Sequence, residues 1–380
     1  MFSYYPLDAA EHARRTPIWE ACIARRACGE AAVVLAGIPD WEECAAQVMP
    51  KEDIPLQKTP GSLPWLDGRI RGQLHYLHTI ERSRCKGDTY PALEIPRNEY
   101  GQSQALAEIF GCRLTEVAAQ PGLLHPEPYT QKSEVLKIKP RPLKDCLYYK
   151  SIEFARYMHQ AVGGEVAIHC PVLTGPMDTA NYVLGTTRLM EWVYDEPEAL
   201  HALLNMITDT LIEIILLYQQ AVEGHTASFL VSCVNGGYLI CSEVRHMISD
   251  DTHREFELPY LKRIGAACGP YAIHTCGCFE RTLRSAMEDP NLFAADFQTK
   301  ETDLVAAIAE TRGQLTLNVR MSGHVGEEYL WPNDEGYYRH LMTDIVEPIP
   351  LNFAVYDIET YRRVQEAFGG GVSGMFRRRI

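Results

Sequence analysis

Apolar strand-like runs alternate with longer helical patterns from about residue 145 onward. Strands that are separated by helices predict parallel β/α units, because two parallel strands need a crossover connection between them. Enough of these units are present for an α/β protein of the (β/α)8 barrel type. The predicted strands are residues 166–173, 227–233, 271–276, 292–297, 314–319 and 350–355.

One long helix is predicted after residue 195. Residues 195–198, Asp-Glu-Pro-Glu, supply an N-cap, a first-turn proline and an acidic side chain near the helix start. Asp209 and Glu213 interrupt the apolar run that follows, so we expect a core-facing amphipathic helix and no membrane span. The predicted apolar face consists of Leu200, Leu203, Leu204, Ile207, Leu211, Ile214, Ile215 and Tyr218.

Residues 1–150 are irregular and rich in turns. We interpret them as early barrel strands wrapped by loops and short helices that cover one end of a single domain spanning residues 1–380. A helical pattern over residues 7–28 precedes an apolar run at residues 31–38. Residues 90–96, Tyr-Pro-Ala-Leu-Glu-Ile-Pro, contain too much proline for a central strand.

A further helix is predicted later in the chain, at residues 252–268, and it is expected to be kinked at Pro259.

Composition limits the possible partners and compartment. The net charge of −14 argues against nucleic acid or an anionic membrane surface as the main partner. The 12 cysteines lack the even spacing of a disulfide framework, which favours a reducing compartment such as the cytoplasm. Residues 1–6 lack the basic and apolar segments of a secretory signal.

The strongest candidate for chemistry is residues 272–278, Ala-Ile-His-Thr-Cys-Gly-Cys. If residues 271–276 are extended, side chains alternate faces, so His274 and Cys276 project to the same side. An imidazole and a thiolate on one face suit zinc, and a catalytic zinc site needs three protein ligands and one open position. The competing interpretation is a structural strand with buried thiols and a capped histidine, and the spacing alone does not choose between them.

Four segments together resemble the uroporphyrinogen decarboxylase superfamily. They are Gly-Pro-Met-Asp-Thr-Ala at residues 175–180, Asp-Glu-Pro-Glu-Ala-Leu at 195–200, Glu-Leu-Pro-Tyr-Leu-Lys-Arg-Ile at 257–264, and His-Thr-Cys-Gly at 274–277. The ordered match covers roughly residues 150–320, with a weaker echo at 92–111. The resemblance implies a (β/α)8 barrel with its site at the carboxyl ends of the strands.

Two branches of this superfamily carry different chemistry. The decarboxylases carry an Arg-Gln-Ala-Gly-Arg signature and a Gly-His-Gly ending, which residues 17–26 and 350–354 do not match. The other branch, zinc-dependent methyltransferases that work with corrinoid proteins, carries a His-x-Cys pair that His274 and Cys276 match. Its third zinc ligand is a cysteine near the last strand, but no cysteine follows Cys278 here. We therefore predict Cys278 as the third ligand, with Cys233 as a second choice.

The resemblance implies a zinc-dependent methyltransferase, with His274 and Cys276 as its catalytic residues. It would move a methyl group between a small methylated or methoxylated compound and the cobalamin of a separate corrinoid protein, as in O-demethylases. Residues 251–256 match only the start of the corrinoid fingerprint Asp-x-His-x-x-Gly, so they are interpreted as a helix cap. The methyl donor and the direction of transfer stay open. The alternatives are a metal-free decarboxylase-like lyase acting on a carboxylated substrate, and a non-catalytic barrel used as a binding partner.

Polar residues at or after the predicted strand ends are candidates for substrate contact, because barrel sites lie there. The turn at Asn235-Gly236-Gly237 is explained equally well by glycine torsions, and His324 is interpreted as a loop histidine. The candidate substrate-binding residues are Asn181, Tyr182, Asn235, Asp296, Gln298 and Arg320.

Overall fold

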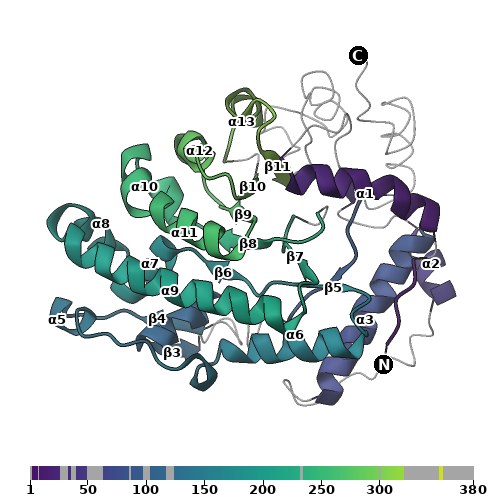
Figure 1. The fold of residues 1–380 in the computed structure, drawn as a ribbon, viewed down its shortest axis with the longest axis horizontal. Coiled ribbons are helices and arrows are strands. Elements are labelled where there is room, and N and C mark those ends of the chain that lie inside the picture. Colours follow the sequence, from purple (N-terminus) through teal and green to yellow (C-terminus); the bar gives the residue numbers. More distant parts are fainter. Residues whose placement is uncertain are drawn as a thin grey trace.

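Parallel strands form the centre of the protein in the computed structural model (Figure 1). The structure describes residues 2–6, 8–25, 33–35, 40–48, 63–84, 87–96, 103–116, 124–231, 234–298, 301–320 and 351–353. The predictions for Cys233 and His324 lie outside these residues.

A seven-stranded parallel sheet carries most of the fold. Its order is β1-β12-β11-β10-β9-β8-β6, so the first strand of the chain pairs with the last. The strands are β1 (Val33–Leu35), β6 (Leu173–Thr174), β8 (Tyr238–Cys241), β9 (Tyr271–His274), β10 (Leu292–Gln298), β11 (Thr316–Arg320) and β12 (Leu351–Phe353).

A second parallel sheet continues this series of strands. It consists of β2 (Ala92–Leu93), β5 (Ala167–His169) and β7 (Thr226–Ala227), in that order. The chain passes from β5 to β6 and from β7 to β8, and a bridge pairs Ala227 with Gly236. The predicted α/β fold with parallel strands is confirmed, and the strands follow one another as in a (β/α)8 barrel. Within the described residues, no pairing joins β1 to β2.

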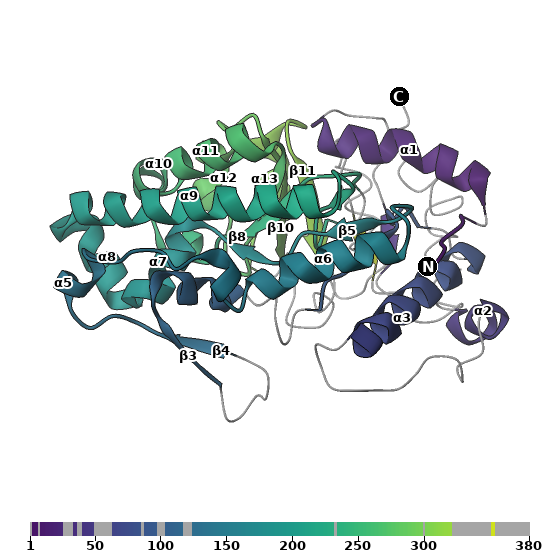
Figure 2. The ribbon, with the colours of Figure 1, turned by 60° about the horizontal axis from the view of Figure 1, so that its bottom comes forward.

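Helices cover the strands on the outside, and α6 and α9 run along each other (Figure 2). One or more helices lie between β8 and β9, between β9 and β10 and between β10 and β11, where they return the chain to the start of the next parallel strand. The helices after residue 145 are α6 (Tyr149–Ala161), α7 (Pro176–Leu184), α8 (Thr186–Asp195), α9 (Pro197–Ala221), α10 (Asp250–Phe256), α11 (Leu258–Cys268), α12 (Glu280–Ala286) and α13 (Leu304–Thr311).

The helix α9 confirms the predicted long amphipathic helix. All eight residues of its predicted apolar face are buried, and it packs on α6, α7, α8 and α11. It is long and apolar enough to span a membrane, but 50% of its most apolar window is buried within the protein. Its neighbours therefore identify it as a core helix.

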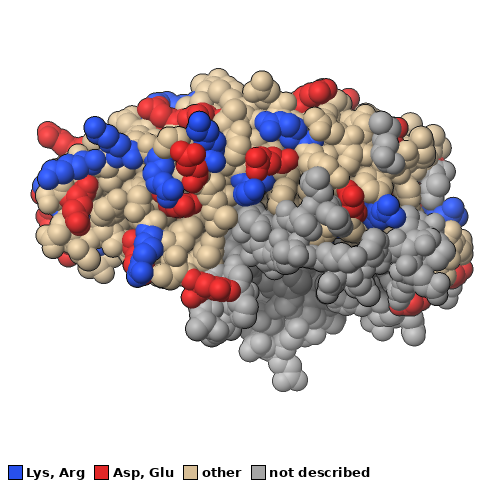
Figure 3. Space-filling view, turned by 90° about the horizontal axis from the view of Figure 1, so that it is seen from below, with Lys and Arg blue, Asp and Glu red and all other residues tan. Residues whose placement is uncertain are grey.

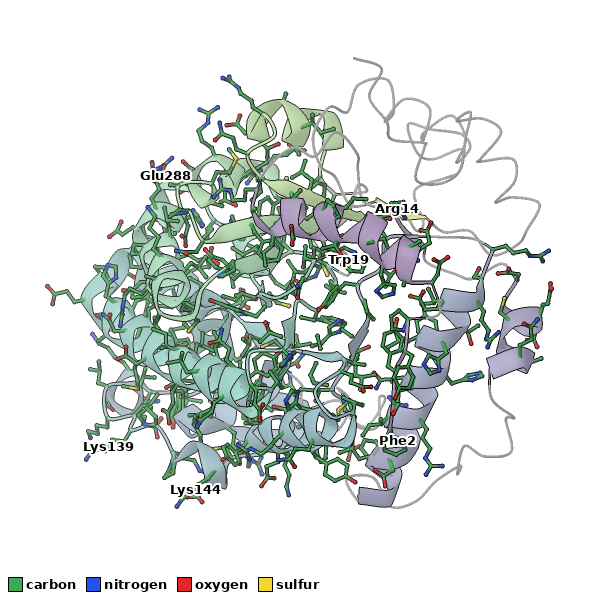
Figure 4. The ribbon with its side chains drawn as sticks, turned by 45° about the vertical axis from the view of Figure 1, so that its right-hand side comes forward. Phe2, Arg14, Trp19, Lys139, Lys144 and Glu288 are labelled. Atoms are coloured by element: carbon green, nitrogen blue, oxygen red, sulfur yellow. The ribbon has the colours of Figure 1, made fainter. Side chains whose placement is uncertain are left out.

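The N-terminal helix α1 (Ala9–Ile23) covers the amino ends of β10 and β11. The Thr316 hydroxyl donates to the Cys22 carbonyl, and the Arg25 side chain, just after α1, donates to the carbonyls of Asp289 and Gln314. Trp19 is buried beneath α1 (Figure 4), and its indole nitrogen donates to the Asp88 carbonyl at 2.6 Å. The predicted covering role of the N-terminal region is therefore met, for the described residues, by α1.

The rest of the described N-terminal region consists of the long helix α3 and shorter elements. The segment at residues 90–96, predicted to be too rich in proline for a central strand, contributes the two-residue strand β2, which pairs with β5. These elements are α2 (Trp41–Val48), α3 (Leu63–Arg82), the 3-10 helix η2 (Ser103–Phe110), the antiparallel pair β3 (Arg113–Glu116) and β4 (Leu124–Glu127), α5 (Lys132–Val135) and the 3-10 helix η3 (Leu143–Asp145).

The predicted strand at residues 227–233 is wrong at residues 228–231, and β8 takes its place in the seven-stranded sheet. Leu230 has a positive φ of 66°, which an extended strand does not accommodate. Gly237 then brings the chain back against the sheet: a Cβ there would lie 2.8 Å from the Phe293 ring, and φ is +73°.

Two other element boundaries differ from prediction. The region 252–268 is divided between α10 and α11 at Glu257, just before the predicted kink at Pro259, which lies in the first turn of α11. The strand β9 ends at His274, and Cys276 lies in the bend that follows.

Candidate metal centre

Four polar side chains lie in one register across the carboxyl ends of neighbouring strands. Cys241 pairs with His274, His274 with Asp296, and Asp296 with Asn318. Paired residues in a parallel sheet place their side chains on the same face. We call Cys241, His274, Asp296 and Asn318 the polar layer.

A short hydrogen bond to Asp296 orients His274. The imidazole is only 5% exposed, and its Nδ1 lies 2.5 Å from Oδ2 of Asp296, which is fully buried. The Asn318 amide donates to the other oxygen of Asp296. We assign the imidazole proton to Nδ1 because a carboxylate accepts there, which presents Nε2 as the ligand atom.

Glu243 and Cys276 meet at the Nε2 side of the imidazole. Oε1 of Glu243 and Sγ of Cys276 each lie 3.2 Å from Nε2 of His274. The other oxygen of Glu243 accepts the backbone N–H of Cys276 at 2.8 Å. Burial alone would raise the pKa of Glu243, but the adjacent His274 imidazole and the hydrogen bond from the Cys276 backbone outweigh it and lower that pKa. Glu243 is therefore held as a carboxylate.

This donor set fits a zinc ion. The ligand atoms of Glu243, His274 and Cys276 all lie within 4.8 Å of one another. Carboxylate oxygen, imidazole nitrogen and thiolate sulfur are the three atom types that zinc accepts in proteins, and the thiolate disfavours magnesium or calcium. Cys276 is exposed while His274 is buried. Three ligands with one solvent-facing side are typical of a catalytic rather than a structural site.

The sequence analysis did not identify Glu243. It follows the unpredicted strand β8 by two residues, just as Cys276 follows β9 by two residues. Because Cys241 pairs with His274, Glu243 and Cys276 occupy equivalent positions beyond the two strand ends. One sequence signal could have identified Glu243: the apolar run of β8 is followed by an acidic residue. This pattern resembles the apolar run of β9, which ends at His274 and is followed by Cys276.

Cys278, the predicted third ligand, lies after the bend at Cys276 and Gly277 and is half-buried. Among the residues that the structure describes, it is not part of the group whose ligand atoms come within 4.8 Å. Gly277 turns the chain between the two cysteines, and Glu243 is the third member of that group.

Tyr182 lies on α7, near Glu243 and Cys241. Burial raises the pKa of its hydroxyl, and the neighbouring Asp178, Cys241 and Glu243 raise it further, whereas a hydrogen bond with Ser103 opposes them. The phenol is therefore neutral.

The other predicted substrate contacts are distributed around the strand ends. On α7, Asn181 has a buried side-chain oxygen without a hydrogen-bond partner. Asn235 is exposed in the turn before β8. Gln298 and Arg320 are paired at the ends of β10 and β11, and Asp296 contacts His274 directly.

The chain matches a known family over most of its regular β/α part. The family model described as "Uroporphyrinogen decarboxylase (URO-D)" matches residues 104–342, which is more than half of the 380 residues. The chain belongs to this family. The resemblance stated from the four sequence segments is thereby confirmed.

Two similar proteins carry methyltransferase names, which correspond to the methyltransferase branch of this family. A "Methylated-thiol--coenzyme M methyltransferase" from Methanosarcina mazei is 31% identical over 114 residues, which cover 30% of this chain and 28% of that relative. The matched part is thus less than a third of the relative's length. A solved structure titled "methyltransferase from Methanosarcina mazei" has a TM-score of 0.57 at 14% identity, covering 90% of this chain and 94% of that one. This second likeness shows a shared fold.

Proposed function

We propose that this protein is a zinc-dependent methyltransferase. It moves a methyl group between a small methylated or methoxylated substrate and the cobalamin of a separate corrinoid protein. The observation that carries the proposal is the Glu243–His274–Cys276 group at the carboxyl ends of the strands in a URO-D family chain. The partial similarity to a methylated-thiol methyltransferase supports the same chemistry.

Glu243, His274 and Cys276 are proposed to hold the zinc ion. Bound there, zinc would act as a Lewis acid on the oxygen or sulfur that carries the methyl group. His274 keeps its Nε2 directed at the group because Asp296 fixes Nδ1. Cys276 is exposed to solvent, so substrate would approach the zinc ion from the side of this residue.

The remaining predicted site residues are proposed as substrate contacts. Tyr182, a neutral phenol near Glu243, can donate a hydrogen bond to the heteroatom that loses the methyl group. Asn181 offers an unpartnered amide oxygen on the same helix. Asn235, Asp296, Gln298 and Arg320 complete this proposed set at the strand ends.

The charges around the polar layer disfavour a carboxylated substrate, as a decarboxylase-like lyase would require. The described carboxyl groups that act on the Cys241 thiol of this layer are Asp178, Glu243 and Asp296. The buried Arg245 guanidinium is already committed to Glu257 and to the face of the Phe279 ring. A neutral methyl donor avoids the repulsion that a carboxylate would meet among these groups.

The surface charge pattern agrees with a small-molecule substrate rather than nucleic acid. On the face shown in Figure 3, Lys and Arg side chains are interspersed with Asp and Glu side chains over the described residues. Nucleic-acid binding needs a clustered basic surface.

Two measurements test the proposed function. Metal analysis of the purified protein should find about one zinc ion per chain, the stoichiometry of a catalytic site. The protein should also convert cob(I)alamin on a corrinoid protein to methyl-cobalamin when methylated thiols or methoxylated aromatic compounds are supplied, followed by the cob(I)alamin absorbance. Zinc-loaded protein that leaves cob(I)alamin unchanged with every donor class would overturn the methyl-transfer proposal.

A further inference from the structure

Glu243 lies on a short backbone segment, residues 242–244, that a buried carboxylate holds in place. Both oxygens of Asp178 accept backbone hydrogen bonds from this segment, one from the Glu243 N–H at 2.7 Å and one from the Val244 N–H at 2.8 Å. Asp178 comes from the first turn of α7 and is only 3% exposed. The first of these two amides belongs to Glu243, whose side chain faces His274.

The start of the same segment is fixed from the other side. The Ser242 N–H donates to the His274 carbonyl at 2.8 Å, and the Ser242 hydroxyl donates to the fully buried Glu257. Glu257 in turn forms an ion pair with the buried Arg245 at 3.5 Å. The backbone on both sides of the Glu243 Cα is therefore bound to groups that cannot move into solvent.

The 3-10 helix that follows this segment also lies close to the bend that carries Cys276. A Cβ at Gly277 would lie 2.6 Å from the Cβ of His246, which follows Glu243 in the 3-10 helix η4 (Val244–Met247). Only glycine permits this approach without displacing one of the two segments. The close contact brings the Glu243 carboxylate within reach of both the Cys276 N–H and the His274 imidazole.

We propose that Asp178 is a positioning residue that fixes Glu243 as the third ligand of the metal ion. The Glu243 side chain has three rotatable bonds and is partly exposed, so its carboxylate converges with His274 and Cys276 only while its backbone is held. Within the described residues, the hydrogen bonds of Asp178 go to the backbone of Glu243 and Val244 and not to the ligand atoms of His274 or Cys276, so it acts through the Glu243 backbone. This inference rests on the proposed metal site.

Asp178→Asn tests the inference, because an amide can accept from one of the two N–H groups but presents its own N–H₂ to the other. Zinc affinity, measured by competition with a chromophoric chelator, should fall about 10–100-fold, the usual effect of losing an outer partner of a metal ligand. The visible spectrum of the cobalt(II)-substituted protein should change, since a ligand is displaced. Asp289→Asn is the matched control: Asp289 is also buried and accepts the Asn291 N–H at 2.9 Å, but it lies at the opposite strand ends. It should leave zinc affinity unchanged.

A double-mutant cycle distinguishes positioning from a general effect on folding. Glu243→Gln should weaken zinc binding, and adding Asp178→Asn to it should cause little further loss, because the ligand through which Asp178 acts is already impaired. A full additional loss in the double variant, or wild-type zinc affinity and cobalt spectrum in folded Asp178→Asn, would overturn the inference while leaving the metal site intact. If Asp178→Asn does not fold, Asp178→Ser, which keeps one acceptor, takes its place. Absence of zinc binding in the wild-type protein would overturn the proposed function itself.

Discussion

Two adjacent layers of side chains on the same strands differ sharply in character. Leu239, Ala272 and Ala294 pack with Ile18 and Trp19 of α1 in one apolar cluster, which we call the apolar layer. Two residues further along the same three strands stand members of the polar layer, Cys241, His274 and Asp296. A step of two residues keeps the same face of the sheet. The amino end of these strands is therefore closed by α1, whereas their carboxyl end carries the candidate metal centre.

This contrast separates stability from function along a few strands. Removing apolar atoms from the closed layer leaves a cavity and lowers the free energy of unfolding. Changing a polar side chain at the other end removes a ligand or its support but few packing contacts. Substitutions in the two layers should therefore affect different measurements, and the following predictions test that separation.

The largest effect is expected from His274→Ala. Loss of the central ligand leaves only Glu243 and Cys276, so zinc bound to the purified protein should fall to near zero and methyl transfer should disappear. The thermal unfolding midpoint of the metal-free protein should stay close to that of the metal-free wild type. His246→Ala is the control, because His246 is an exposed neighbour that is not part of the ligand group, and it should keep its zinc. Full zinc content in His274→Ala would remove the proposed site.

Trp19→Ala should do the opposite. Trp19 is buried in the apolar layer, packs edge-on against Tyr90 at 5.0 Å between ring centroids, and donates to the Asp88 carbonyl. Its removal should lower the free energy of unfolding by about 3–5 kcal/mol, measured by urea denaturation of the metal-free protein. Zinc bound per folded chain should not change. Trp19→Phe, which keeps most of the ring, should cost much less, and an equal loss in both variants would contradict a packing role.

Asp296→Asn should have an intermediate effect that is confined to the metal. An amide N–H₂ facing Nδ1 of His274 favours the tautomer with its proton on Nε2, so the ligand atom is lost to the metal. Zinc affinity should fall about 10–100-fold, as when other outer partners of ligating histidines are replaced. Asn318→Ala removes only a donor to Asp296 and should have a smaller effect. Unchanged zinc affinity in Asp296→Asn would show that this hydrogen bond does not orient the imidazole.

The proximity of His274 and Cys276 could be predicted because it follows from the pattern within a single segment. Alternation along one strand identified His274 and Cys276, although β9 ends at His274. The buried face of α9 followed from helical spacing. Family resemblance supplied the fold, and the prediction of zinc chemistry rests on the same resemblance.

Glu243 could not be predicted in the same way because its place depends on the register between two strands. The strand before it was misplaced, since the positive φ of Leu230 and the turn at Gly236 and Gly237 interrupt the apolar pattern. Asp296 was predicted to lie at a strand end and to contact substrate, whereas its hydrogen bond with His274 was not predicted. Its contact with His274 depends on the pairing of β9 with β10, which a single sequence does not contain.

The smallest effect is expected from Cys278→Ser, and it decides between the two candidates for the third ligand. Cys276 and Cys278 are both accessible free thiols on the same turn, so they form a matched pair. Cys276→Ser should lose most of its zinc because a ligand atom within 4.8 Å of the other two is removed. Cys278→Ser should retain wild-type zinc content, affinity and cobalt(II) spectrum, because Glu243 supplies the third ligand. Loss of zinc from Cys278→Ser together with retention in Glu243→Gln would reverse this assignment and place Cys278 in the site.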